Sequence, residues 1–158
     1  MIGINTTSKN KHVGEIKRKI QHAKNQCRCI TTDMKFNILP NSIIRALVIH
    51  AAMFMNSYQD KQGISQEFSP RELVLRWQLC TKKHIRAQFG SFCVTYDVPS
   101  PNETNRQDSR ARYAICLGPT GNFQGTHKFL CLQSKRIIKR RDFNRIPGIS
   151  DIACFARA

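Results

Sequence analysis

Acidic residues are scarce in this sequence. The chain has 10 Asp and Glu residues against 26 Lys and Arg in 158 residues, which gives a formal net charge of +16. This balance argues against chemistry on small acidic molecules or on a metal alone, and it predicts a polyanionic partner. Because 41% of the residues are apolar, the chain can bury a modest core, as one domain or as two very small ones.

Long apolar runs are also missing. The longest, Ile43–Met55, is interrupted by Arg45 and His50 and is shorter than the roughly 18 to 20 residues that a bilayer span requires. The segment Met1–Asn10 is polar, so no secretory signal is expected. The sequence therefore predicts a protein without membrane association. It also predicts a nuclear or cytoplasmic location inside the cell, and no secretion.

The seven cysteines form no Cys-x-x-Cys pair, and the five histidines supply no paired partner. Structural zinc needs four ligands at short, paired spacings, so no metal site and no cofactor is predicted. Cys93, Cys116 and Cys131 are instead interpreted as small hydrophobic residues of strands. His84 is interpreted as a surface member of a basic stretch.

Three helices are expected in the first half of the chain. Apolar spacing predicts one over residues 12–28, and Lys17, Gln21, Lys24 and Arg28 form a basic ridge along it. A second, over residues 41–58, is apolar almost all round, which is typical of a helix buried on several sides. A third, short helix is expected after Ser69, where proline takes the first helical position.

From Phe89 onward the apolar period changes to two. Strands are expected around residues 92–96, 113–117, 129–132 and 136–143, with a turn at Gly118–Asn122. Four or five short antiparallel strands joined by tight turns favour a small barrel. The predicted fold class is therefore α+β, with helices first and a small β-barrel after them.

Six sequence segments, in this order and at these intervals, resemble the integrase region of copia-type long-terminal-repeat retrotransposon polyproteins. The segments are His12–Arg18, Leu39–Pro40, Gly63–Gln66 with Ser69–Arg71, Lys82–Phe92, Ala114–Asn122, and Lys128–Leu132 with Ile138–Arg141. The resemblance implies that residues 1–80 are the helical remnant of an RNase-H-like catalytic core. It implies a Src-homology-3-like barrel over residues 81–143, followed by a tail at 144–158.

Intact members of that family join DNA with two magnesium ions held by two aspartates and a glutamate. Three carboxylates are needed because two dications must be neutralised at close range. On this alignment the aspartates would precede Met1, and Lys17 of Ile16-Lys17-Arg18 takes the glutamate position. If the alignment slips and Glu15 is the ligand, one carboxylate still cannot assemble the site. The resemblance therefore implies a chain that is not an enzyme.

Two further departures follow from the same alignment. The family has a Thr-Gly turn where this chain has Ser134-Lys135, so a residue other than glycine is expected at positive φ there. The sheet strands that would cover helix 41–58 would also precede Met1. Leu47, Val48 and Phe54 are therefore expected to be exposed, with residues 1–80 forming mobile or self-associating helices.

The favoured function is a non-catalytic integrase fragment that binds DNA or other nucleic acid without reading its sequence. The candidate phosphate contacts are basic residues of the first helix, the linker and the last strand: Lys17, Lys24, Arg28, Lys82, Lys83, Arg86, Lys135, Arg136, Lys139, Arg140 and Arg141. The main alternative is an interaction module that associates with intact integrase copies, or with itself, through residues 41–58. An unrelated basic RNA-binding or ribosomal protein and an active nuclease are the remaining alternatives.

Overall fold

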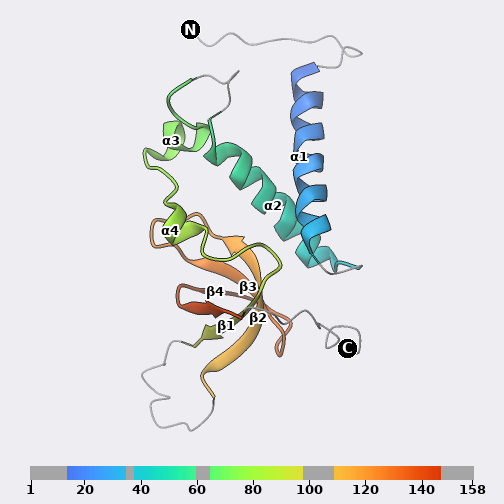
Figure 1. Ribbon diagram of the computed structural model, residues 1–158, viewed down its shortest axis with the longest axis vertical. Coiled ribbons are helices and arrows are strands. Elements are labelled where there is room, and N and C mark those ends of the chain that lie inside the picture. The colour runs from blue at the N-terminus through green and yellow to red at the C-terminus, as the bar shows by residue number, and fades with distance from the viewer. Residues whose placement is uncertain (1–13, 35–37, 60–64, 98–108, 147–158) are drawn as a thin grey trace.

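The computed structural model describes residues 14–34, 38–59, 65–97 and 109–146, and it shows helices followed by an antiparallel sheet (Figure 1). The helices are α1 (Gly14–Asp33), α2 (Asn41–Ser57), α3 (Pro70–Leu75) and α4 (Thr81–His84). The strands are β1 (Phe92–Tyr96), β2 (Ala111–Pro119), β3 (His127–Cys131), β4 (Ile137–Arg140) and β5 (Phe143–Arg145). The α+β class is confirmed. The expected helix start at His12 and most of the tail lie outside the described residues.

Three of the four helices agree with the sequence patterns, with a difference in the length of α1, whereas the short helix α4 was not predicted. Helix α1 continues to Asp33, five residues beyond the expected end at Arg28. Helix α3 begins as predicted. The Ser69 side chain accepts a hydrogen bond from the Glu72 backbone N–H, and the Glu72 carboxylate accepts one from the Ser69 backbone N–H. No helix among the described residues is both long and apolar enough to cross a bilayer.

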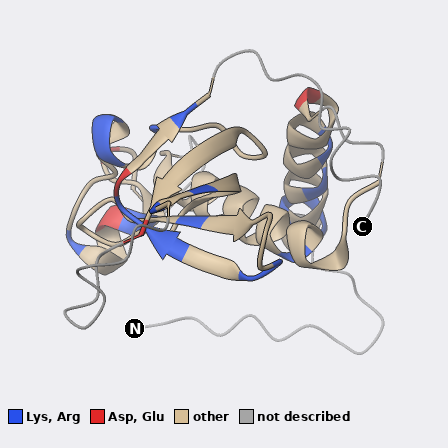
Figure 2. Cartoon of the chain, turned by 90° about the horizontal axis from the view of Figure 1, so that it is seen from below, with Lys and Arg blue, Asp and Glu red and all other residues tan. Residues whose placement is uncertain are grey.

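The five strands form one sheet in the order β4-β3-β2-β1-β5, and every neighbouring pair is antiparallel. The strand expected over residues 136–143 is therefore two strands, which lie at opposite edges. A flat sheet would hold these edges roughly 19 Å apart, whereas the short link from Arg140 to Phe143 spans at most roughly 10 Å. The sheet must curl, and its strands wrap around a common interior (Figure 2). No ladder joins β4 to β5 in the described part of the chain, so the sheet is open.

From Ala114 onward, strand β2 is buried on both faces, which explains its run of apolar residues there. Ile115 and Leu117 join the cluster under α2, whereas Ala114 and Cys116 face the interior of the curled sheet. Cys93 and Cys131 are also fully buried and unpaired, so the interpretation of these cysteines as strand hydrophobes is confirmed. Burial raises the pKa of the Cys116 thiol to about 12.

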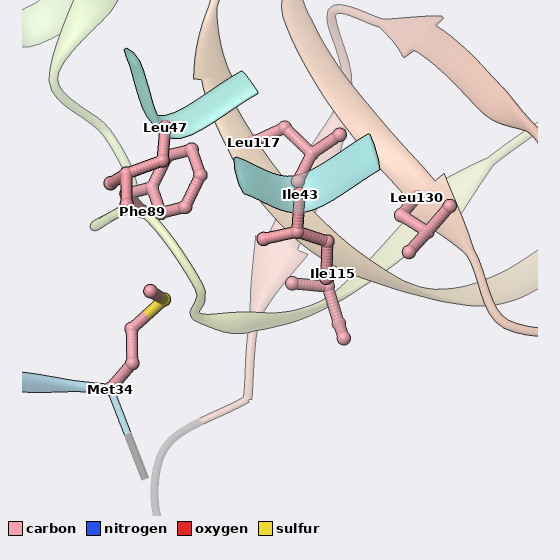
Figure 3. Packing of buried hydrophobic residues seen from close by; sticks show 7 residues of the cluster. All are labelled: Met34, Ile43, Leu47, Phe89, Ile115, Leu117 and Leu130. Atoms are coloured by element: carbon pink, nitrogen blue, oxygen red, sulfur yellow. The ribbon is translucent and has the colours of Figure 1, made fainter. Parts of the chain in front are cut away.

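Helix α2 lies across the sheet, and the core forms between them. Ile43 and Leu47 of α2 pack with apolar residues of the segments after it: Phe89, Ile115, Leu117 and Leu130, with Met34 at the margin (Figure 3). The expectation that Leu47 is exposed is wrong, since only 4% of it is accessible. Val48, the next residue of α2, points away from this cluster and is 53% exposed as expected, and Phe54 is half-buried. The two predicted units thus share one hydrophobic cluster.

The β3–β4 turn confirms a backbone expectation. Lys135 adopts a φ of 53°, in the left-handed region, as expected from the glycine that the sequence resemblance places at this position. A side chain costs on the order of 1 kcal/mol in that conformation. The turn still closes, because the Cys131 N–H donates to the Arg136 carbonyl at 3.0 Å. The turn therefore tolerates a lysine at this position, with a modest loss of stability.

His50 is a buried polar residue at the contact between α2 and β2. The residue is 9% exposed, and its ring packs against those of Phe54 and Phe89, with centroid distances of 4.6 and 5.0 Å. Among the described residues, Nδ1 of His50 has no hydrogen-bond partner. Burial, assisted by the nearby His127, lowers the pKa of His50 from 6.5 to about 4.

Acidification should therefore destabilise the protein before its carboxylates titrate. A histidine whose folded pKa is depressed binds its proton more readily when unfolded, so stability is lost as pH falls from about 6.5 toward about 4. The shift corresponds to at most about 3 kcal/mol. Urea denaturation at several pH values measures this loss. His50→Leu should flatten most of the slope, leaving the part that His127 contributes, and an unchanged slope in that variant would contradict the assignment.

Candidate nucleic-acid interface

Four of the predicted basic residues meet around one surface pocket beside α4. Two segments far apart in sequence supply them: α4 with the residues after it, and the link between β4 and β5. The pocket has a volume of about 410 Å³ and is lined by Lys82, Lys83, Arg86, Phe123, Gln124, Gly125 and Arg141. Among the residues that the structure describes, no acidic side chain lines it, so four cations share the pocket without a carboxylate in its wall. We call it the α4 pocket.

Arg86 fastens the two sides of the α4 pocket to each other. Its guanidinium donates to the backbone carbonyl of Arg141 at 3.0 Å and to that of Phe143 at 3.3 Å. It also lies 4.5 Å from the centroid of the Phe143 ring, a cation–π contact. Two carbonyls and a ring thus fix the guanidinium, so Arg86 positions Arg141 as well as adding charge.

Two buried histidines hold the β2–β3 loop against α4. Nδ1 of His84 lies 2.9 Å from the Cys80 carbonyl oxygen, and Nε2 lies 2.8 Å from that of Asn122. Nε2 of His127 lies 3.1 Å from the carbonyl oxygen of His84, and burial is the main cause that lowers the pKa of His127. His84 is 1% exposed, so its interpretation as a surface residue is wrong. From its buried position His84 contacts the β2–β3 loop, which forms one wall of the α4 pocket.

The loop approaches α4 so closely that glycine is required at one position. Gly125 has a φ of +75°, and a Cβ there would lie 2.9 Å from the backbone oxygen of Lys83. Both the conformation and the contact exclude a side chain. This close approach brings Phe123 and Gln124 to the rim of the pocket beside Lys83.

Arg140 differs from the other predicted contacts because its charge is already paired. Its guanidinium donates to Asp97 at 2.6 Å, and Arg112 contacts the same carboxylate. Burial would raise the pKa of Asp97, but the hydrogen bonds and charges of the two arginines outweigh burial and lower it. Arg140 therefore fixes the β4 edge to the end of β1 more than it offers charge to a partner.

The remaining predicted contacts lie outside the α4 pocket. Lys135, Arg136 and Lys139 are exposed on the β3–β4 turn and on β4. Lys17, Lys24 and Arg28 are exposed along α1, and this helix lies on the opposite side of α2 from α4 (Figure 1). A shallow groove of about 470 Å³ runs along α1, lined by Gly14, Lys17, Arg18, Gln21, His22 and Asn25. The structure thus separates the α1 ridge from the α4 pocket.

A magnesium pair of the kind that intact integrases hold does not fit the residues present. Within residues 14–34, 38–59, 65–97 and 109–146, no group of three or more His, Cys, Asp or Glu side chains could hold a metal ion. Lys17, which the sequence resemblance aligns with the glutamate of intact integrases, is an exposed residue of α1. A cation there would repel the ions that the carboxylate binds.

The chain was compared with protein-family models, curated proteins and solved structures, and none of them matches it. The resemblance to integrases is carried by the sequence segments alone, and no comparison tests it.

Proposed function

We propose that this chain is a non-catalytic relative of retrotransposon integrases that binds nucleic acid through the α4 pocket by charge, without reading sequence. One observation carries the proposal: Lys82, Lys83, Arg86 and Arg141 line a single pocket, and no carboxylate of the described residues lines it. Clustered cations neutralise adjacent phosphates and release condensed counterions, which favours binding whatever the base sequence.

The sheet supports the second half of the family assignment. Strands β4 and β5 are joined by a short link yet lie at opposite edges, so the sheet curls toward closure as in a small Src-homology-3-like barrel. In the same proposal, α1 and α2 are the closing helices of an RNase-H-like core. The sheet here covers the face of α2 that the strands of such a core would cover.

Salt should weaken nucleic-acid binding steeply. Four phosphate contacts predict a slope of log K against log salt near −3.6 on duplex DNA, or about a 150-fold loss of affinity from about 50 to about 200 mM salt. Fluorescence anisotropy of a labelled duplex measures this slope. Lys82→Gln should lower its magnitude by about one.

Two variants of equal net charge serve as controls. Arg45→Gln removes an exposed cation of α2 far from the pocket in sequence, and it should leave the slope unchanged. Lys17→Gln tests the α1 ridge and should also leave it unchanged if the α4 pocket is the site. Absence of binding to any nucleic acid in dilute salt would refute the proposed function.

A further inference from the structure

An exposed aromatic ring stands at the rim of the α4 pocket. Phe123, in the β2–β3 loop, is 70% exposed and lines the pocket. Nζ of Lys83 lies 5.2 Å from the centroid of its ring, so charge and ring adjoin. Single exposed apolar residues are common on protein surfaces, but this one adjoins the clustered cations of the pocket.

The Phe123 ring packs against a cluster of aromatic side chains formed by Trp77 and His84. The Trp77 ring meets the Phe123 ring edge-on, with centroids at 6.0 Å and an interplanar angle of 81°. Trp77 in turn lies between the Arg71 guanidinium, 4.6 Å from its centroid, and the His84 ring at 5.5 Å. Arg71 also donates to the Gly121 carbonyl at 2.5 Å, which ties α3 to the loop that carries Phe123.

The loop itself is held by its own hydrogen bonds. The Thr126 N–H donates to Oδ1 of Asn122 at 2.9 Å, and Nδ2 of Asn122 donates to Oγ1 of Thr126 at 3.0 Å. The Thr120 N–H donates to the Thr126 carbonyl at 2.8 Å. Phe123 lies inside this closed loop, so its ring is presented in a fixed place beside the pocket. Such preorganisation reduces the entropy lost when a partner binds.

We propose that the α4 pocket takes a nucleic-acid strand with unpaired bases, one of which stacks on Phe123 while the neighbouring phosphates contact the four basic side chains of the pocket. This inference rests on the proposed function and specifies its substrate. Cationic grooves with aromatic platforms are the usual means of holding single strands, because every base has a face that can stack. In a duplex the bases stack on one another, so the ring gains nothing from them.

The single tryptophan of the chain makes the test direct. Trp77 is the only Trp and contacts Phe123, so its fluorescence reports a base arriving at the ring. Titrations with oligothymidylate, oligouridylate and a duplex of equal length, each about 15 nucleotides, compare the substrates. Phe123→Ala should weaken binding of the single strands by about fivefold to a hundredfold and leave duplex binding within about twofold. Phe123→Tyr, which keeps the ring, should restore single-strand binding.

The outcomes separate this inference from the proposed function. Equal losses on single strands and duplex in Phe123→Ala would mean that the ring only positions Lys83, and would overturn the inference. Unchanged binding of every substrate in that variant would overturn it too, while salt-dependent duplex binding would leave the proposed function standing. If no substrate binds the unaltered protein, both fail. Thermal unfolding of Phe123→Ala checks that the variant folds, as the exposure of Phe123 leads us to expect.

Discussion

Leu47→Asp should unfold the helices and the sheet together. Leu47 is 4% exposed and packs in one cluster with Phe89 and Leu117, so the new carboxylate would be buried without a partner. We expect a loss of about 4 kcal/mol or more, a large fraction of the roughly 5 to 15 kcal/mol that stabilises a domain of this kind. Urea denaturation followed by both circular dichroism and Trp77 fluorescence measures the loss.

Val48→Asp is the matched control, since it places the same side chain one residue further along α2 on the exposed face. Val48 is 53% exposed, so the change in stability should stay within about 0.5 kcal/mol. The same variant tests association through residues 41–58, because it alters the outer surface of α2 and leaves the core intact. If Leu47→Asp abolished helical structure while β2 and β3 kept their hydrogen-exchange protection, the shared core would be refuted.

Local patterns in the sequence predicted most of the elements. The period of two located the strands, although it merged β4 with β5. The alternation within β2 is explained by two cores: Ile115 and Leu117 face one, and Ala114 and Cys116 face the other. The burial of Leu47 was missed because the resemblance assigned its cover to strands before Met1. Its actual cover comes from residues roughly 40 to 80 positions later in the chain, and no local periodicity reports such a contact.

The site shows the same division between local and distant information. Composition identified the basic residues of the α4 pocket, but the meeting of Arg86 with Arg141 depends on the curl of the sheet. His84 was misplaced because a helix of four residues has no period to reveal a buried face, and its partner Asn122 is 38 residues away. Phe123 was not singled out for binding, although an aromatic residue inside a Gly-rich turn next to basic segments is a usable signal.

Gly118→Ala should destabilise the contact between α2 and β2 severely. Gly118 has a φ of +91°, and a Cβ there would lie 2.2 Å from Nδ1 and 2.9 Å from Cε1 of His50. The ring cannot retreat easily, because Phe54 and Phe89 pack against it. Overpacking contributes about 1 to 3 kcal/mol and the left-handed backbone about 1 to 2 more. We expect a total loss of about 3 kcal/mol or more in urea denaturation.

A double-mutant cycle separates the two causes. In a His50→Ala background the new methyl group has room, so Gly118→Ala should cost only the backbone part, about 1 to 2 kcal/mol. Gly14→Ala controls for replacing a glycine as such: a Cβ there meets no atom of the described residues within 4 Å, and the change should be neutral or slightly stabilising. If Gly118→Ala costs the same in both backgrounds, the contact with His50 carries no energy and the backbone conformation alone explains the glycine. A smaller cost in the His50→Ala background would show that the buried imidazole of His50 fills the space beside Gly118, where a side chain would otherwise lie. This contact would then couple α2 to the sheet that carries the α4 pocket.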